Sequence, residues 1–284
     1  MMINLDGLEN FDNLEDINKE LQRRAQAYNN SAIDDFEALS PIQMRILQQD
    51  FLASENPLKI NPLSEEALVK SPLLVQVRFL MNKMKGGTEL NLTKTGALPT
   101  KVVRDIYDLG VLKNEWVEEG ITKLYKEDNA PEIGITRILL QISSLAKVRN
   151  GKLSLTKKGE KYLDDGNFIL KEILALLLNK FNWAYFDGYE SEEIGRINAG
   201  FSLFLLKKYG DKKRPASFYA EKYFRAMPLL LDDQQKDFRC YAVRTFERYF
   251  YYLGFVETEK DGVLKPIHLK KTDFFDHLFS INEH

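Results

Sequence analysis

The sequence predicts a mainly α-helical protein with small β-hairpins. Three observations predict this class: apolar residues recur at helical spacing along most of the chain, Asn150-Gly151 lies between two short alternating runs, and a helix end followed by strand, turn and strand occurs twice. The length of 284 residues and the 44% hydrophobic content allow one large domain or two ordinary ones. We therefore predict tandem winged-helix-like units, the second elaborated with extra helices.

Charge divides the chain unevenly. The first 70 residues hold 6 Lys/Arg and 13 Asp/Glu, whereas the rest hold 34 and 29. Within the acidic part, Ser40-Pro41 predicts a helix with serine at the cap and proline at the first helical position. We predict three segments: an acidic helical extension and linker over 1–70, a winged-helix-like unit over 71–165, and a second, elaborated unit over 166–284.

The first unit follows from its apolar periodicity. A helical stripe over 73–84, an alternating strand over 89–93, a helix over 99–110 that begins at a proline, and a third helix over 135–145 occur in that order. Asn150-Gly151 then predicts a type I′ hairpin, because both of its positions need positive φ. A loop of about twenty residues between the second and third helices is longer than a helix-turn-helix turn usually is.

The second unit resembles the first at its end. Residues 239–254 are predicted to form the third helix, and a longer hairpin with Asp261-Gly262 at its turn follows. We place the first helix at 168–181, which leaves two further helical stretches before the third. That is one helix more than a minimal winged helix, so either this half is elaborated or the repeat ends at the hairpin.

Cysteine content and hydropathy indicate the compartment. The only cysteine, Cys240, cannot form an intramolecular disulfide, which favours a reducing compartment. The start of the chain lacks the features of a signal peptide, and no apolar run approaches the roughly 20 residues that span a bilayer. We therefore expect a cytoplasmic protein without membrane contact. Cys240 itself is either a small buried hydrophobe, the commoner case, or a reactive thiol at a helix start.

Motifs for catalysis are absent from the sequence. No GxGxxG or GxxxxGK[ST] loop occurs. His268, His277 and His284 all lie in the last seventeen residues, and Asp273 with His277 would supply only two metal ligands on one helical face. We therefore predict a non-enzymatic protein with no cofactor, no metal and no evident small-molecule ligand.

Nucleic-acid binding is the first functional hypothesis. In a winged helix the exposed face of the third helix enters the major groove and the hairpin contacts the backbone, so both should carry basic and polar residues. The near balance of 40 basic and 42 acidic residues argues against strong non-specific binding, and lysine-rich turns are also ordinary solvated surface. The candidate contacts in the two units are Arg137, Gln141, Arg149, Lys152, Arg244 and Arg248.

A protein-interaction or scaffold role is the alternative, with a homodimer as one form of it. Two windows, NWAYFDGY and RYFYYLGF, together contain nine aromatic residues. Tyrosine and tryptophan are enriched at interface centres, whereas the extra helices of the second half would otherwise cover these rings as core. The sequence leaves this choice open.

A family resemblance covers roughly residues 40–165. The segment LNLTKTGALPTKVV, with the hairpin region KLSLTKKGEKYL, resembles an uncharacterised family of bacterial proteins with an LTxTGxLPxxVV signature. The resemblance implies a winged-helix-like organisation and no catalytic residues. As local structure, Gly96 turns the chain and Pro99 begins the second helix. The signature residues are Leu92, Thr93, Thr95, Gly96, Leu98, Pro99, Val102 and Val103.

Overall fold

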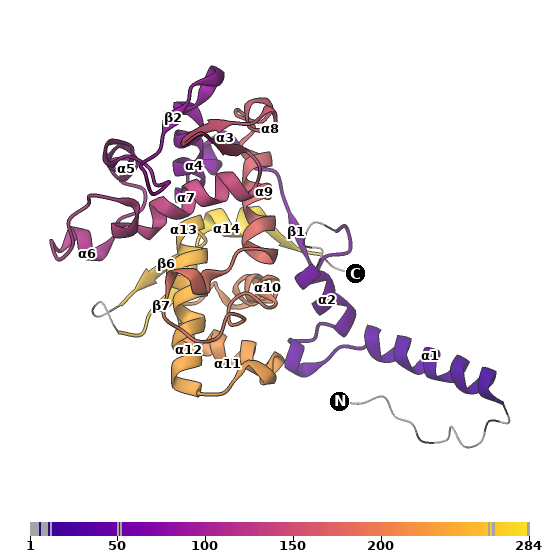
Figure 1. Ribbon diagram of the computed structural model, residues 1–284. Coiled ribbons are helices and arrows are strands. Elements are labelled where there is room, and N and C mark those ends of the chain that lie inside the picture. Colours follow the sequence, from indigo (N-terminus) through magenta and orange to yellow (C-terminus); the bar gives the residue numbers. More distant parts are fainter. Residues whose placement is uncertain are drawn as a thin grey trace.

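The computed structural model describes residues 6, 11, 13–49, 51, 53–260, 262 and 265–282. Helices dominate, and the strands form three small antiparallel sheets, which confirms the predicted fold class (Figure 1). The α-helices are α1 (Leu14–Asn30), α2 (Pro41–Gln49), α3 (Glu65–Leu68), α4 (Pro72–Lys83), α5 (Thr100–Tyr107), α6 (Glu115–Glu118), α7 (Pro131–Ile142), α8 (Lys157–Lys161), α9 (Gly166–Asn179), α10 (Ala199–Tyr209), α11 (Ala216–Ala226), α12 (Gln234–Ala242), α13 (Tyr251–Leu253) and α14 (Asp273–Leu278).

The strands are short, and several helical turns are not α-helical. The strands are β1 (Leu58–Ile60), β2 (Leu90–Asn91), β3 (Ala146–Arg149), β4 (Lys152–Leu155), β5 (Arg214–Pro215), β6 (Val256–Glu259), β7 (His268–Lys271) and β8 (Phe279–Ile281). The 3-10 turns are η2 (Asp34–Phe36), η3 (Lys85–Gly87), η4 (Glu127–Asn129), η5 (Trp183–Phe186) and η6 (Pro228–Leu230), and η7 (Val243–Phe250) is a π-helical stretch that joins α12 to α13.

In the first half of the repeat the elements α4, β2, α5, α7, β3 and β4 follow one another in the chain, and the strands are arranged β2-β4-β3 in the sheet. Leu90 of β2 pairs with Leu153 of β4, and Val148 of β3 pairs with the same residue from the other side. Asn150 and Gly151 have φ values of 52° and 71°, so both turn positions are left-handed as the sequence predicts. The predicted hairpin is therefore confirmed.

The second half repeats that order with α10, β5, α11, α12 to α13, β6 and β7, and its strands lie in the corresponding order β5-β7-β6. The position equivalent to α4 is held by α10, so the sequence-based choice of residues 168–181 as the first helix is wrong. Most of those residues belong to α9, which ends at Asn179 and lies between the halves in the chain. The error arose because β5 has only two residues and no alternation, which hides the helix–strand order. Asp261 of the predicted turn lies outside the described residues.

Part of the N-terminal segment packs against the rest of the protein. Helix α2 packs on α10, where a Cβ on Gly200 would overlap the carbonyl oxygen of Leu47. Strand β1 pairs with β8, so Leu58 faces Ile281 across a small sheet whose two strands are far apart in the sequence. Helix α1 has no buried residue and extends away from the body (Figure 1). The predicted segment boundaries at residues 70 and 165 stay predictions.

One hydrophobic core connects these parts. Its buried residues run from Leu39 near the start to Phe279 near the end and include side chains of both halves of the repeat. Because a single cluster continues through both halves, the helices of one half are held against those of the other by apolar burial. This continuity decides which faces of the third helices stay accessible.

Candidate nucleic-acid interface

Helix α7 is the third helix of the first half, and most of it is buried. All side chains from residue 132 to residue 136 are buried. Arg137 has only 17% of its side chain exposed, and its guanidinium binds the Glu127 carboxylate at 2.8 and 2.9 Å. The same carboxylate accepts a 2.6 Å hydrogen bond from the backbone amide of Leu98. Arg137 therefore ties α7 to the two loops beside it.

The remaining surface of α7 is apolar. Ile142 is 44% exposed, and Ile138 is partly exposed one turn before it. Gln141 is only partly exposed, and its Nε2 atom is buried with no hydrogen-bond partner among the described residues. The polar face expected on this helix is therefore not present, because most of the helix surface packs against the core.

The β3–β4 hairpin does carry accessible cations. Arg149 and Lys152 are exposed, and the Lys152 ammonium lies 2.8 Å from the Glu89 carboxylate. The hydrogen bond and charge of Lys152 lower the pKa of Glu89, and the charges of Lys147 and Arg149 lower it further. One carboxylate thus faces three basic side chains, which leaves this hairpin with local positive charge.

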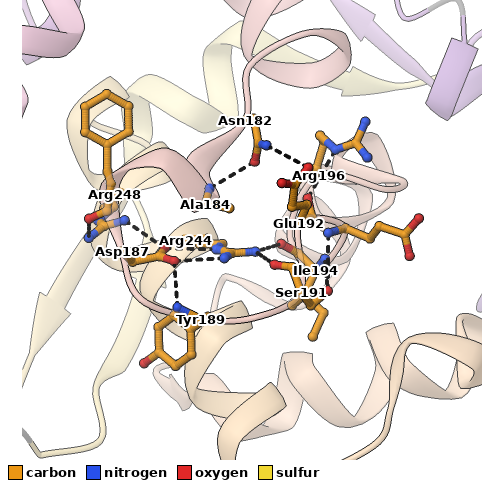
Figure 2. A network of polar contacts seen from close by, with 12 residues as sticks. Asn182, Ala184, Asp187, Tyr189, Ser191, Glu192, Ile194, Arg196, Arg244 and Arg248 are labelled. Atoms are coloured by element: carbon orange, nitrogen blue, oxygen red, sulfur yellow. Dashed lines mark hydrogen bonds and ion pairs between the residues drawn. The ribbon is translucent and has the colours of Figure 1, made fainter.

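Arg244 lies in the second half on η7, and it points into the protein. Only 1% of its side chain is exposed. Its Nε and Nη2 atoms donate to the Asp187 carboxylate at 3.0 and 2.8 Å, and Nη1 donates to the carbonyl oxygens of Ser191 and Ile194 at 2.7 and 3.0 Å (Figure 2). The expectation that this arginine lies on an exposed helix face is therefore corrected.

Arg248 joins the same network one turn later. Its Nη1 atom donates to Asp187 at 3.0 Å and its Nη2 atom to the carbonyl oxygen of Phe186 at 2.9 Å, with 17% of the side chain exposed. Burial alone would raise the pKa of Asp187, but the hydrogen bonds and charge of Arg244, helped by Arg248, lower it below its usual value. The two arginines hold the loop that contains η5 against the third helix.

The accessible part of this third helix is its beginning, which the sequence-based boundary missed. Helix α12 begins at Gln234, five residues before the predicted start, and the Asp233 side chain caps it by accepting from the amides of Gln235 and Lys236. Aspartate at the cap position was the signal that could have located this start. Exposed side chains occupy the first turn, from residue 234 to residue 236.

A cleft of about 950 Å³ lies beside that first turn. It is enclosed by α12, by the start of α11, and by residues 265–267, which lead into β7. Its lining contains three cationic side chains, a serine and two glutamines but no carboxylate. The lining residues are Tyr189, Ala216, Ser217, Gln234, Gln235, Lys236, Phe238, Arg239, Ala242, Lys265, Pro266 and Ile267.

Two of the three cations are unengaged within the described residues. Arg239 pairs with Glu247, whereas neither Lys236 nor Lys265 forms an ion pair with any described residue. Both lysines are exposed at the edge of the cleft. Lys236 is in the first turn of α12, where the Asp233 side chain already binds the amides of Gln235 and Lys236, so the lysine ammonium is the group that remains for an anion. The cleft therefore favours an anionic group at its edge.

The aromatic windows are mainly core. Trp183, Tyr249, Phe250 and Phe255 are each at most 2% exposed. Tyr185, by contrast, is 90% exposed. The helices of the second half cover most of the rings, which answers the question that the sequence left open for these residues.

Cysteine and histidine positions offer little chemistry. Cys240 is buried, and burial raises the pKa of its thiol to about 12, so the commoner interpretation as a buried hydrophobe is supported. His277 contacts the backbone carbonyl oxygen of Asp273 at 2.6 Å, and His284 lies outside the described residues. The described part of the chain contains no group of three or more side chains placed to hold a metal ion.

None of the helices among the described residues combines the length and the apolar composition that crossing a bilayer requires.

Comparison with known proteins finds one family model that matches part of the chain. Residues 69–167 match the family model of the Y4jL N-terminal domain. The match begins just before α4, passes the β3–β4 hairpin and ends at the start of α9, so it covers the first half of the repeat. It supports the resemblance to an uncharacterised family over this region. No curated protein and no solved structure matches the chain.

Proposed function

We propose that this chain is a non-enzymatic, cytoplasmic protein of two winged-helix units that binds nucleic acid through the second unit. The repeated order of helix, strand, helix, helix, strand and strand supports the winged-helix assignment, since that order places a hairpin directly after the third helix. The contact surface is the cleft between α11, α12 and residues 265–267.

The observation that carries this proposal is the charge of the cleft. Lys236 and Lys265 line it without an ion-pair partner among the described residues, Arg239 lines it while paired with Glu247, and no carboxylate is among the lining residues, in a protein whose overall charge is close to balanced. Basic side chains are among the usual partners of phosphate oxygens. A local site of this kind supports selective contact with nucleic acid, while the balanced total explains why strong non-specific attraction is not expected.

The exposed cations of the first unit extend this proposal. Arg149 and Lys152 stay candidates for contact with the phosphate backbone through the β3–β4 hairpin. Arg137, Arg244 and Arg248 serve the fold in the present arrangement, because each is engaged with a buried carboxylate.

Binding of the full-length protein to fluorescent DNA and RNA tests the proposal. We expect binding at about 50 mM salt that weakens as salt rises, because phosphate contacts release counterions. The Lys236→Gln, Lys265→Gln double variant should weaken binding at least several-fold. Lys101→Gln removes an exposed lysine of α5 that is unpaired within the described residues, and it is the matched control. No binding of any nucleic acid at about 50 mM salt would overturn the proposal.

Protein interaction is the second candidate function, and one observation favours it. Trp116, Ile121 and Tyr125 are 46%, 60% and 55% exposed within a short segment that includes α6. Neighbouring exposed apolar side chains of this kind mark interaction sites. A second copy of the chain is the simplest partner, so light scattering should give a dimer mass that Trp116→Ser reduces to a monomer. A monomeric wild-type protein would count against this candidate.

A further inference from the structure

The floor of the cleft is apolar and aromatic, which phosphate binding alone does not explain. Tyr189 and Phe238 line it and are both partly exposed, and the buried residues Ala216, Ala242 and Ile267 line it as well. One face of Phe238 is covered by Phe224, whose ring is stacked on it at 5.4 Å between centroids with 3° between planes. Cations at the edge and rings on the floor form a surface with two chemically different parts.

Tyr189 is held in place by the buried ion-pair network. Its backbone amide donates to the Asp187 carboxylate at 3.2 Å, and the Arg244 guanidinium lies 5.8 Å from the centre of its ring. Figure 2 shows the amide directed at Asp187 and the ring turned away from the hydrogen bonds of the network. Because Asp187 is bound by two arginines, the backbone that carries the ring is fixed before any ligand arrives, which lowers the entropy cost of ordering this loop on binding.

This arrangement distinguishes single strands from duplex. In a duplex the faces of the bases are stacked on one another, so only phosphates and groove edges are available to a protein. In a single strand a base can leave the stack and place its face on an aromatic side chain while neighbouring phosphates meet basic residues. The aromatic floor would stay unfilled beneath a duplex, whereas an unpaired base covers it.

We infer that the cleft binds an unpaired base of a single-stranded nucleic acid, with Tyr189 as the ring on which the base stacks. This inference rests on the proposed function and specifies its substrate class. Lys236 and Lys265 contact the phosphates on either side of that base. Asp187 and Arg244 are positioning residues, since they act on the base only through Tyr189.

The test compares single-stranded and duplex oligonucleotides of one sequence and about 16 nucleotides, bound to the full-length protein and measured by fluorescence anisotropy. The single strand should bind at least tenfold more tightly. Tyr189→Leu keeps an apolar side chain without a ring, and it should weaken single-strand binding about 5- to 160-fold, the range that loss of one stacked base produces. Tyr189→Phe should bind like the wild type. Tyr185→Leu, an exposed ring in the same loop that is not among the lining residues of the cleft, is the matched control.

A second measurement does not depend on the variants being folded. An abasic strand keeps the phosphates and lacks the bases, so wild-type protein should bind it at least about 5-fold more weakly than it binds the normal strand. Equal affinity for single strand and duplex, or for abasic and normal strands, would overturn the inference and leave the proposed function standing. Failure of the wild-type protein to bind any of these nucleic acids would overturn both.

Discussion

The guanidinium of Arg244 holds the carboxylate of Asp187 through two hydrogen bonds, of 3.0 and 2.8 Å, with 1% and 6% of the two side chains exposed. The residues are 57 positions apart in the sequence. This pair joins the π-helical part of the third helix to the loop that carries Tyr189. It therefore connects the stability of the second half to the geometry of the cleft.

Loss of Arg244 should be strongly destabilising. Arg244→Leu leaves the buried Asp187 carboxylate with Arg248 as its remaining cation, and removing one partner of a buried pair costs about 3–5 kcal/mol. We expect a loss of about 3 kcal/mol in the free energy of unfolding, measured by urea denaturation. Arg248→Leu is the control, since that side chain is more exposed and makes one contact with the carboxylate. Equal losses for the two variants would contradict the central role of Arg244.

Acid should weaken the second half through Asp187. Its pKa is lowered in the folded protein, because the hydrogen bonds and charge of Arg244 outweigh the opposing effect of burial. The unfolded chain therefore binds a proton more readily, so the stabilisation is complete above the ordinary pKa of about 3.9 and is lost as the pH falls through the lowered value. Unfolding midpoints measured in urea below about pH 5 should fall less steeply for Asp187→Asn than for the wild type. Parallel curves would show that Asp187 does not control this loss.

Glu132 should have the opposite pH dependence. The residue is only 3% exposed, and its Oε1 atom has no hydrogen-bond partner among the described residues. Burial raises the pKa of its carboxyl group. The folded protein then binds the proton more readily than the unfolded chain, so stability is lost as the pH rises through the raised value. Glu132→Gln removes this charge and should increase the free energy of unfolding at pH 7 but not in acid. A destabilised variant at pH 7 would refute this.

Gly200 tests how closely the N-terminal segment is joined to the body. A Cβ at this position would overlap the backbone carbonyl of Leu47, so Gly200→Ala must push α2 away from α10. Overpacking of this kind costs typically about 1–3 kcal/mol, which thermal or urea unfolding would detect. Gly188→Ala is the matched control, because a Cβ there meets nothing within 4 Å and should change stability by less than about 0.5 kcal/mol. A neutral Gly200→Ala would mean that the two helices are loosely packed.

Local sequence signals predicted much of the first half. Pro72 stands at a helix start, and Asn150 with Gly151 forms the expected left-handed turn, whereas α7 begins at Pro131, four residues before the predicted start at residue 135. The first two predictions are correct because they depend only on the φ preference of a single residue or on the missing amide donor of a proline. The predicted start of α12 is wrong, because its apolar periodicity begins later than the Asp233 cap that marks the first turn.

The candidate site was predicted only in part. Arg149 and Lys152 are exposed on the hairpin, as the alternating pattern indicates. Arg244 looks equally available in the sequence, because helical periodicity cannot show that Asp187 from a distant loop will bind it. The cleft itself combines three separate segments of the second half, so no local pattern contains it.

The sequence by itself determined the helical class and the helix followed by a hairpin that occurs twice, because these follow from side-chain periodicity and backbone preferences within a few residues. Tertiary structure decided that residues 58–60 pair with residues 279–281, that α10 begins the second half of the repeat, and which basic side chains are accessible. Burial and ion pairing join residues that are far apart in the chain. A charged side chain is therefore a surface contact or a structural support according to the neighbours that folding brings to it.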